Sequence, residues 1–271
     1  MRHRIFLALI LLLVVRLPLG IAEQPSSSHA QETREQEARQ ILQAAGAQGG
    51  VIIHVGCGDG RLTAALQAGD RYLVQGLDID WKNVEAARKH IQSLGQYGKV
   101  SVAQWSGERL PYVDNLANLV VSEDLGRIPM HEVMRVLAPH GAAYIKAGGR
   151  WQKVVKPWPA EMDQWTHFLH DPDNNAVSHD RLVASPRCLQ WISDPVYGRH
   201  HDRLASVSAM VSAHGRLFSI EDRGPAVSIK LPAEWRLIAR DAFNGVILWE
   251  LPIHNWQTTS TGFRSGPTQL P

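Results

Sequence analysis

The residues with the clearest chemical potential form a glycine-rich turn that follows an apolar run. Residues 51–55 are mostly apolar and rich in β-branched side chains, which predicts a buried strand. The chain then reads Gly56-Cys57-Gly58-Asp59-Gly60-Arg61 and continues into an expected helix. Glycines let the backbone turn sharply and let a ligand lie against bare main chain. Because a helix N-terminus also offers unpaired N–H groups, this turn is a candidate binding site.

A carboxylate follows the next expected strand, about 20 residues after the glycines, where it can accept hydrogen bonds from ribose hydroxyls. That strand, residues 72–77, leads into Asp78-Ile79-Asp80. The third glycine of the turn comes one position too early for the G-x-G-x-x-G pattern, which argues against a pyrophosphate-binding dehydrogenase. We therefore predict a nucleoside site. The alternatives are a turn that binds nothing and two solvated carboxylates.

Strands and helices alternate around these residues. The periodicity predicts helices at residues 33–45, 60–67, 81–94 and 130–137, and strands at 51–55, 72–77, 99–103, 117–121 and 142–147. Such alternation is typical of a parallel sheet with helices on its faces. The expected fold class is therefore α/β. Within it, Cys57 is expected to pack rather than to act as a nucleophile, because the sequence places no histidine to activate it.

Residues 51–145 resemble a class I S-adenosylmethionine-dependent methyltransferase. Residues 55–60 resemble the first motif of that family, Asp78 stands at the position of its ribose-binding acid, and residues 108–112 and 132–141 are similar to its stretches before strands four and five. The resemblance implies a Rossmann-like sheet and S-adenosylmethionine as a small-molecule cofactor. It implies a cofactor site made of Gly56, Cys57, Gly58, Gly60, Asp78, Ile79, Ser106 and Gly107. It names neither a catalytic residue nor a methyl acceptor.

The chain departs from this family in three places. Ser106 stands where an acid is common, and His140 replaces a usual glycine. The family adds an antiparallel hairpin after strand five, but here residues 150–155 leave room for one strand before Pro157 and Pro159. We therefore expect a sheet abbreviated at its end. These departures favour the alternative function, a non-catalytic methyltransferase-like module with a binding or structural role.

The segment 148–186, after the methyltransferase-like domain at 32–147, is rich in tryptophan, histidine and proline. His167 and His170 could share one helical face, as metal ligands do, and His179 follows. Prolines and asparagines nearby indicate turns, however, and no spacing matches a known ligand signature. We expect a polar linker docked by its tryptophans, with no metal, and leave the metal site as the alternative.

Residues 187–271 predict short strands only. One strand is expected at residues 189–192. Two hairpins are expected, the first from residues 209–212 and 216–221 and the second from residues 235–240 and 246–251. Asn244-Gly245 closes the second hairpin. Residues 235–250 resemble the repeat of pyrroloquinoline-quinone-type β-propellers. Because a propeller needs roughly four to eight blades, we expect about one blade of a longer, truncated protein and infer no bound quinone.

The N-terminus predicts export. Residues 1–22 join a basic start, an apolar run at 5–15 and small residues before Ala22, which indicates a signal peptide. The run is shorter than the about 20 residues of a membrane span. We expect the periplasm or cell surface, with an uncleaved signal anchor as the alternative, and a disordered spacer at 23–31.

Lys and Arg total 28 against 26 Asp and Glu, which gives no basic surface for nucleic acid. The arrangement resembles large exported fusion proteins of the planctomycete type.

Overall fold

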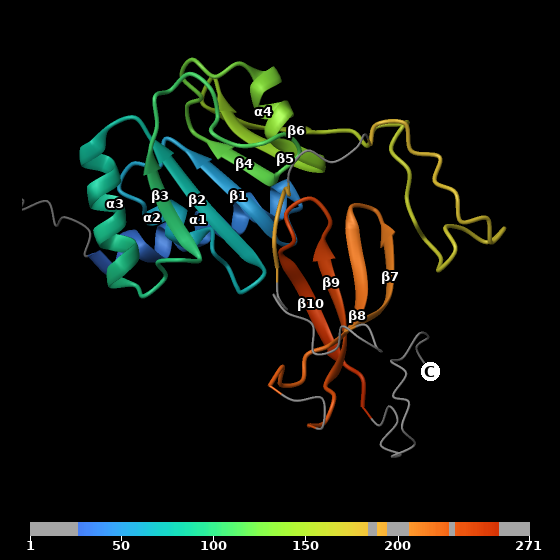
Figure 1. The fold of residues 1–271 in the computed structure, drawn as a ribbon. Coiled ribbons are helices and arrows are strands. Elements are labelled where there is room, and N and C mark those ends of the chain that lie inside the picture. The colour runs from blue at the N-terminus through green and yellow to red at the C-terminus, as the bar shows by residue number, and fades with distance from the viewer. Residues whose placement is uncertain (1–26, 184–188, 194–205, 228–230, 255–271) are drawn as a thin grey trace, which may run out of the picture.

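The computed structural model describes residues 27–183, 189–193, 206–227 and 231–254. These residues form two sheets. Residues 156–183, which follow the first sheet, form no regular helix or strand and run at the right of Figure 1. The expected signal peptide lies outside the described residues, as does Cys188. Among the helices that the structure describes, none has the length and apolar character needed to cross a membrane.

The first sheet is mixed and has six strands in the order β3-β2-β1-β4-β5-β6. Their bounds are β1 Gly50–Val55, β2 Tyr72–Asp78, β3 Val100–Gln104, β4 Ala117–Ser122, β5 Leu137–Ala147 and β6 Arg150–Val155. The first five pair in parallel, and β6 pairs antiparallel with β5. The expected parallel sheet is therefore confirmed. The strand order reverses at β1, and in open α/β sheets ligands bind beyond the carboxyl ends of the strands at such a point.

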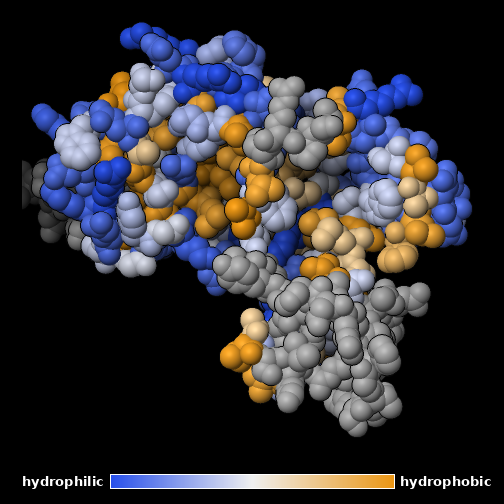
Figure 2. Space-filling model, in the orientation of Figure 1, coloured by the Kyte–Doolittle hydropathy of each residue, from blue (hydrophilic) through white to orange (hydrophobic). Residues whose placement is uncertain are grey.

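In the described part of the chain, four helices flank this sheet: α1 Ser27–Ala45, α2 Arg61–Ala65, α3 Trp81–Ser93 and α4 Met130–Val136. One buried cluster joins Ile41 of α1 and Val84 of α3 to Ile52 of β1. A second cluster joins Val133 of α4 to Ile53 of β1. Successive β1 side chains thus enter opposite cores, which explains why this strand is apolar almost throughout. Figure 1 shows α1 and α2 behind the sheet, and Figure 2 shows apolar residues on the side facing the viewer.

Three boundaries differ from the sequence prediction by five residues or more. Helix α1 begins at Ser27, inside the expected spacer, and an i,i+4 bond from Gln31 to Glu35 supports its first turns. Strand β5 begins at Leu137 instead of 142, because Leu137 already pairs with Ala117 of β4. Residues 138–141 then form an irregularity in the ladder, with His140 at φ +66°. Strand β6 extends the sheet to Val155, into the expected linker, and pairs along residues 142–147. In the described residues the sheet does end on that single antiparallel strand.

The second sheet is antiparallel, with the order β10-β9-β8-β7. Its strands are β7 Val207–Ala213, β8 Arg216–Asp222, β9 Trp235–Asp241 and β10 Ile247–Pro252. The two expected hairpins are therefore present. The strand expected at 189–192 is not formed: Trp191 Nε1 instead donates to the Ala242 carbonyl at 3.0 Å, so this segment lies against the β9–β10 turn.

Candidate functional site

The glycine turn closes directly onto the end of β2. The N–H groups of Gly56 and Cys57 both donate to the Leu77 carbonyl, at 2.8 and 3.1 Å. Gly56, Gly58 and Gly60 have φ angles of +75°, +51° and +78°, a region in which side chains are strained. The sequence therefore needs glycine at each of these positions to lead β1 into α2.

The space around the three glycines differs. A Cβ built on Gly58 would meet nothing within 4 Å, and one on Gly56 would meet only the Asp124 carbonyl, at 3.9 Å. A Cβ on Gly60 would instead lie 2.6 Å from the Cβ of Ala87 on α3. Gly56 and Gly58 thus leave an open cradle above bare backbone. Gly60 allows close packing of α2 against α3, and its contact with a cofactor stays a prediction.

Asp78 holds this turn in place. Its carboxylate is 6% exposed, and Oδ2 accepts the Gly58 N–H at 2.9 Å. Oδ1 accepts the Asp80 N–H at 2.9 Å and the amide of Asn83 at 3.2 Å. A carboxylate oxygen offers about two acceptor positions, so Oδ2 keeps one for a ligand hydroxyl. The alternative of two solvated carboxylates fails for Asp78. Asn83, five residues later, is a contributor that the sequence reasoning missed.

An apolar edge lies beside the carboxylate. Ile79 is 64% exposed, and a Cβ on Gly107 would lie 3.2 Å from its Cγ2 atom. The Trp105 N–H donates to the Asp78 carbonyl at 3.0 Å, which brings the segment after β3 to the end of β2. Ser106, between Trp105 and Gly107 in the sequence, is exposed. The structure therefore brings Asp78, Ile79, Ser106 and Gly107 to one edge of the sheet.

Two buried side chains under the turn are not reactive groups. Burial, with a smaller contribution from the Asp78 charge, raises the pKa of the Cys57 thiol to about 12. Cys57 packs against Gly76, where a Cβ would come within 2.9 Å of the Cys57 Cβ. Burial also lowers the pKa of His54 to about 4, and its Nδ1 lies 2.8 Å from Thr63 Oγ1. The packing role predicted for Cys57 agrees with this environment.

The residues present fit an adenosine-type cofactor. The open cradle over Gly56 and Gly58, the remaining acceptor on Asp78 and the exposed apolar Ile79 suit a ribose with substituents on both sides. A cavity of about 250 Å³ lies elsewhere, between the two sheets, and Asn118 and Asp241 are among its lining residues.

Residues 52–141 match the family described as a methyltransferase domain. The match covers about a third of the chain and includes the glycine turn, Asp78 and Gly107. It supports S-adenosylmethionine as the cofactor. No curated protein matches the chain.

Solved structures similar to the chain include three methyltransferases. A putative S-adenosylmethionine-dependent methyltransferase from Methanococcus maripaludis is 24% identical, with a TM-score of 0.39, over 45% of this chain and 63% of its own. A putative sarcosine dimethylglycine methyltransferase from Galdieria sulphuraria is 20% identical, with a TM-score of 0.39, over 44% and 48%. A geranyl diphosphate methyltransferase in complex with SAM is 16% identical, with a TM-score of 0.37, over 45% and 56%. The chain thus spans less than two thirds of each.

Proposed function

We propose that the mixed-sheet part binds S-adenosylmethionine beyond the carboxyl ends of β1, β2 and β3 and transfers its methyl group to an acceptor still to be identified. The hydrogen bond from the Gly58 N–H to Asp78 carries this proposal. It fixes a carboxylate with a spare acceptor beside a turn that has open space above it. A nucleoside can bind there through its ribose while its substituent lies along Gly56 and Gly58.

Methyl transfer places few demands on the protein. When bound beside Gly56, Gly58 and Asp78, the cofactor would supply an electrophilic sulfonium methyl group for direct displacement by a lone pair of the acceptor, with S-adenosylhomocysteine as the leaving group. Holding the two reactants in line is the main source of acceleration. The role of Gly56, Gly58 and Asp78 is accordingly to bind and orient, and the proposal names no general base.

Calorimetric titration of the full chain with S-adenosylmethionine and S-adenosylhomocysteine tests the proposal. The diagnostic variant is Gly58→Ala, which puts a methyl group into the cradle. Gly95→Ala is the matched control, because Gly95 also has a positive φ, +68°, and open space, but it lies after the far end of α3. We expect micromolar binding by the wild type, at least about tenfold weaker binding by Gly58→Ala and unchanged binding by Gly95→Ala. Equal affinity in all three proteins, or no binding by a folded wild type, overturns it.

A second candidate is a non-catalytic module that supports the antiparallel sheet. The observation favouring it is a direct bond between the sheets, from the Asn118 amide of β4 to the Asp241 carboxylate of β9 at 2.6 Å. The Asn244 amide reinforces the join by donating to the Leu116 carbonyl at 2.9 Å. A folded chain that binds neither cofactor, yet loses its second sheet when this join is cut, would support this role.

The resemblance to a propeller blade and the export of the chain remain proposals. The four antiparallel strands leave apolar side chains uncovered, with Met210 47%, Trp249 41% and Leu251 54% exposed. Neighbouring blades would cover such faces. Reading the genomic DNA past codon 271 for further repeats ending in tryptophan tests the blade. N-terminal sequencing of the secreted protein tests cleavage after Ala22.

A further inference from the structure

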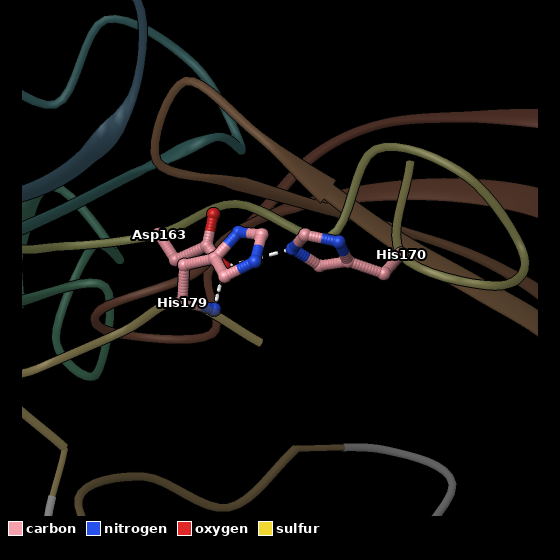
Figure 3. A group of neighbouring side chains, drawn as sticks. All are labelled: Asp163, His170 and His179. Atoms are coloured by element: carbon pink, nitrogen blue, oxygen red, sulfur yellow. Dashed lines mark hydrogen bonds and ion pairs between the residues drawn. The ribbon is translucent and has the colours of Figure 1, made fainter. Parts of the chain in front are cut away.

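Residues 156–183, after the mixed sheet, bring together three side chains that are seven and nine positions apart along the chain. Asp163, His170 and His179 each offer one ligand atom, and these atoms all lie within 4.8 Å of one another. Figure 3 shows the His170 ring reaching toward the Asp163 carboxylate from the side opposite to His179. The rings of His170 and His179 meet edge to face, 5.2 Å apart.

The contacts within this cluster are close to those of neighbouring metal ligands. His170 Nε2 lies 2.8 Å from Asp163 Oδ2. Two ligand atoms that are each about 2.1 Å from a tetrahedral metal ion lie roughly 3.4 Å apart. A cation could therefore take the place of this hydrogen bond after the two side chains move slightly apart.

His170 also has the environment of a metal-bound histidine. Its side chain is 4% exposed, and its buried Nδ1 has no hydrogen-bond partner. Nδ1 lies 3.4 Å from the Asp171 carboxylate. Histidines that bind metals through one nitrogen commonly present the other to a carboxylate, which fixes the ring and raises its basicity. Asp171 is placed for that supporting role, behind the ring and away from Asp163.

Hydrogen bonds anchor the carboxylate and the loop around it. N–H groups of His179 and Gln164 donate to Asp163 at 2.6 and 2.7 Å. Trp165 and Ser212 of β7 exchange two hydrogen bonds, at 2.7 and 3.0 Å, which tie the segment to the second sheet. A ligand set held in this way loses little freedom on binding a cation.

We propose that Asp163, His170 and His179 form a binding site for one divalent transition-metal ion of the zinc class. Imidazole nitrogens suit zinc, nickel, iron and copper, whereas calcium and magnesium take oxygen ligands. Three protein ligands leave at least one coordination position for water, and the exposure of His179 leaves that position accessible. His170 adopts φ +75°, a strained conformation for a residue with a side chain. In the sequence, only the residue types indicated a metal site, because the spacing of Asp163 from the two histidines matches no recognisable ligand signature.

Titration of the untagged full chain with Zn²⁺, after removal of metals with a chelator, tests the site. The diagnostic variant is His179→Ala, because His179 is exposed and its replacement spares the fold. His170→Ala is the second variant. His167→Ala is the matched control, since His167 lies in the same loop, is exposed and has its Nδ1 2.8 Å from Thr166 Oγ1, outside the cluster.

We expect one tight Zn²⁺ site per chain, at least about tenfold weaker binding in both His170→Ala and His179→Ala, and unchanged binding in His167→Ala. Co²⁺ added to the apo protein should give a visible absorption band that His179→Ala loses. The proposal is wrong if binding is weak and involves several sites, as for scattered surface histidines, or if His179→Ala binds as tightly as His167→Ala. If His170 and Asp163 form only a structural hydrogen bond, His179→Ala will bind Zn²⁺ as His167→Ala does.

Discussion

The Asn118 amide nitrogen lies 2.6 Å from the Asp241 carboxylate and joins the mixed sheet to the antiparallel sheet. The side-chain oxygen of Asn118 accepts hydrogen bonds from the Val51 N–H at 2.8 Å and from the Asn244 amide at 2.7 Å. One side chain of β4 thus contacts β1 and the β9–β10 turn together. Burial raises the pKa of Asp241, so this carboxylate depends on the donors around it.

Replacement of Asn118 by alanine should loosen the join between the sheets. The change leaves a buried carboxylate without one donor and the Val51 N–H without its acceptor, each of which costs about 1–3 kcal/mol. We expect urea unfolding to show a loss of about 2–4 kcal/mol. Asn175→Ala, at an exposed asparagine, is the control and should change stability little. Similar stability of the two variants would show that the join contributes nothing.

His54 should make stability depend on pH in acid. Its pKa is about 4 when folded and about 6.5 when unfolded, so between these values the unfolded chain binds a proton that the folded chain does not. The unfolding free energy therefore falls as the pH is lowered from about 6.5 to about 4, by roughly 3 kcal/mol from this residue. Urea unfolding across that range should show a shallower slope for His54→Asn than for the wild type. The exposed control, His131→Asn, should keep the wild-type slope.

Gly60→Ala should destabilise the protein more than Gly95→Ala. Both glycines have positive φ, +78° and +68°, so both variants carry backbone strain of about 1–3 kcal/mol. Only the Gly60 variant adds a collision, with the Cβ and Cα of Ala87 at 2.6 and 2.8 Å. The double variant with Ala87→Gly should recover part of the loss in thermal unfolding. If the effects of Gly60→Ala and Ala87→Gly on thermal stability simply add, the collision between residues 60 and 87 does not explain the loss.

The Cys57 thiol should resist alkylation in the folded protein. Its pKa of about 12 leaves almost no thiolate at pH 8, and the side chain is buried. A Cys188→Ser variant leaves Cys57 as the one thiol of the chain, since the sequence has two cysteines. Iodoacetamide labelling followed by mass spectrometry should be slow without denaturant and fast in urea. Rapid labelling of the native protein would instead indicate an accessible, activated thiol.

The sequence by itself determined the order of elements and the core of the candidate site. The apolar run before Gly56 and the acid after the next run predicted β1, β2, the glycine turn and Asp78, because strand burial and left-handed turns depend on local residue type. Strand β6 lies at residues 150–155, where the sequence left room for one strand, but the start of α1 was predicted less well. The extent of α1 depends on contacts within its first helical turns.

Only the tertiary structure decided which distant residues meet. Asn118 and Asp241 are 123 positions apart, and nothing in the local pattern of either predicts the other. The same holds for Asp163 with His179, which irregular backbone brings together without helical or strand spacing. Periodicity reports which face of an element is buried, whereas contacts between elements depend on how the whole chain packs. The position of the sheet join therefore came from the fold alone, whereas for the proposed metal site the sequence offered His170 and His179 but not their contact with Asp163.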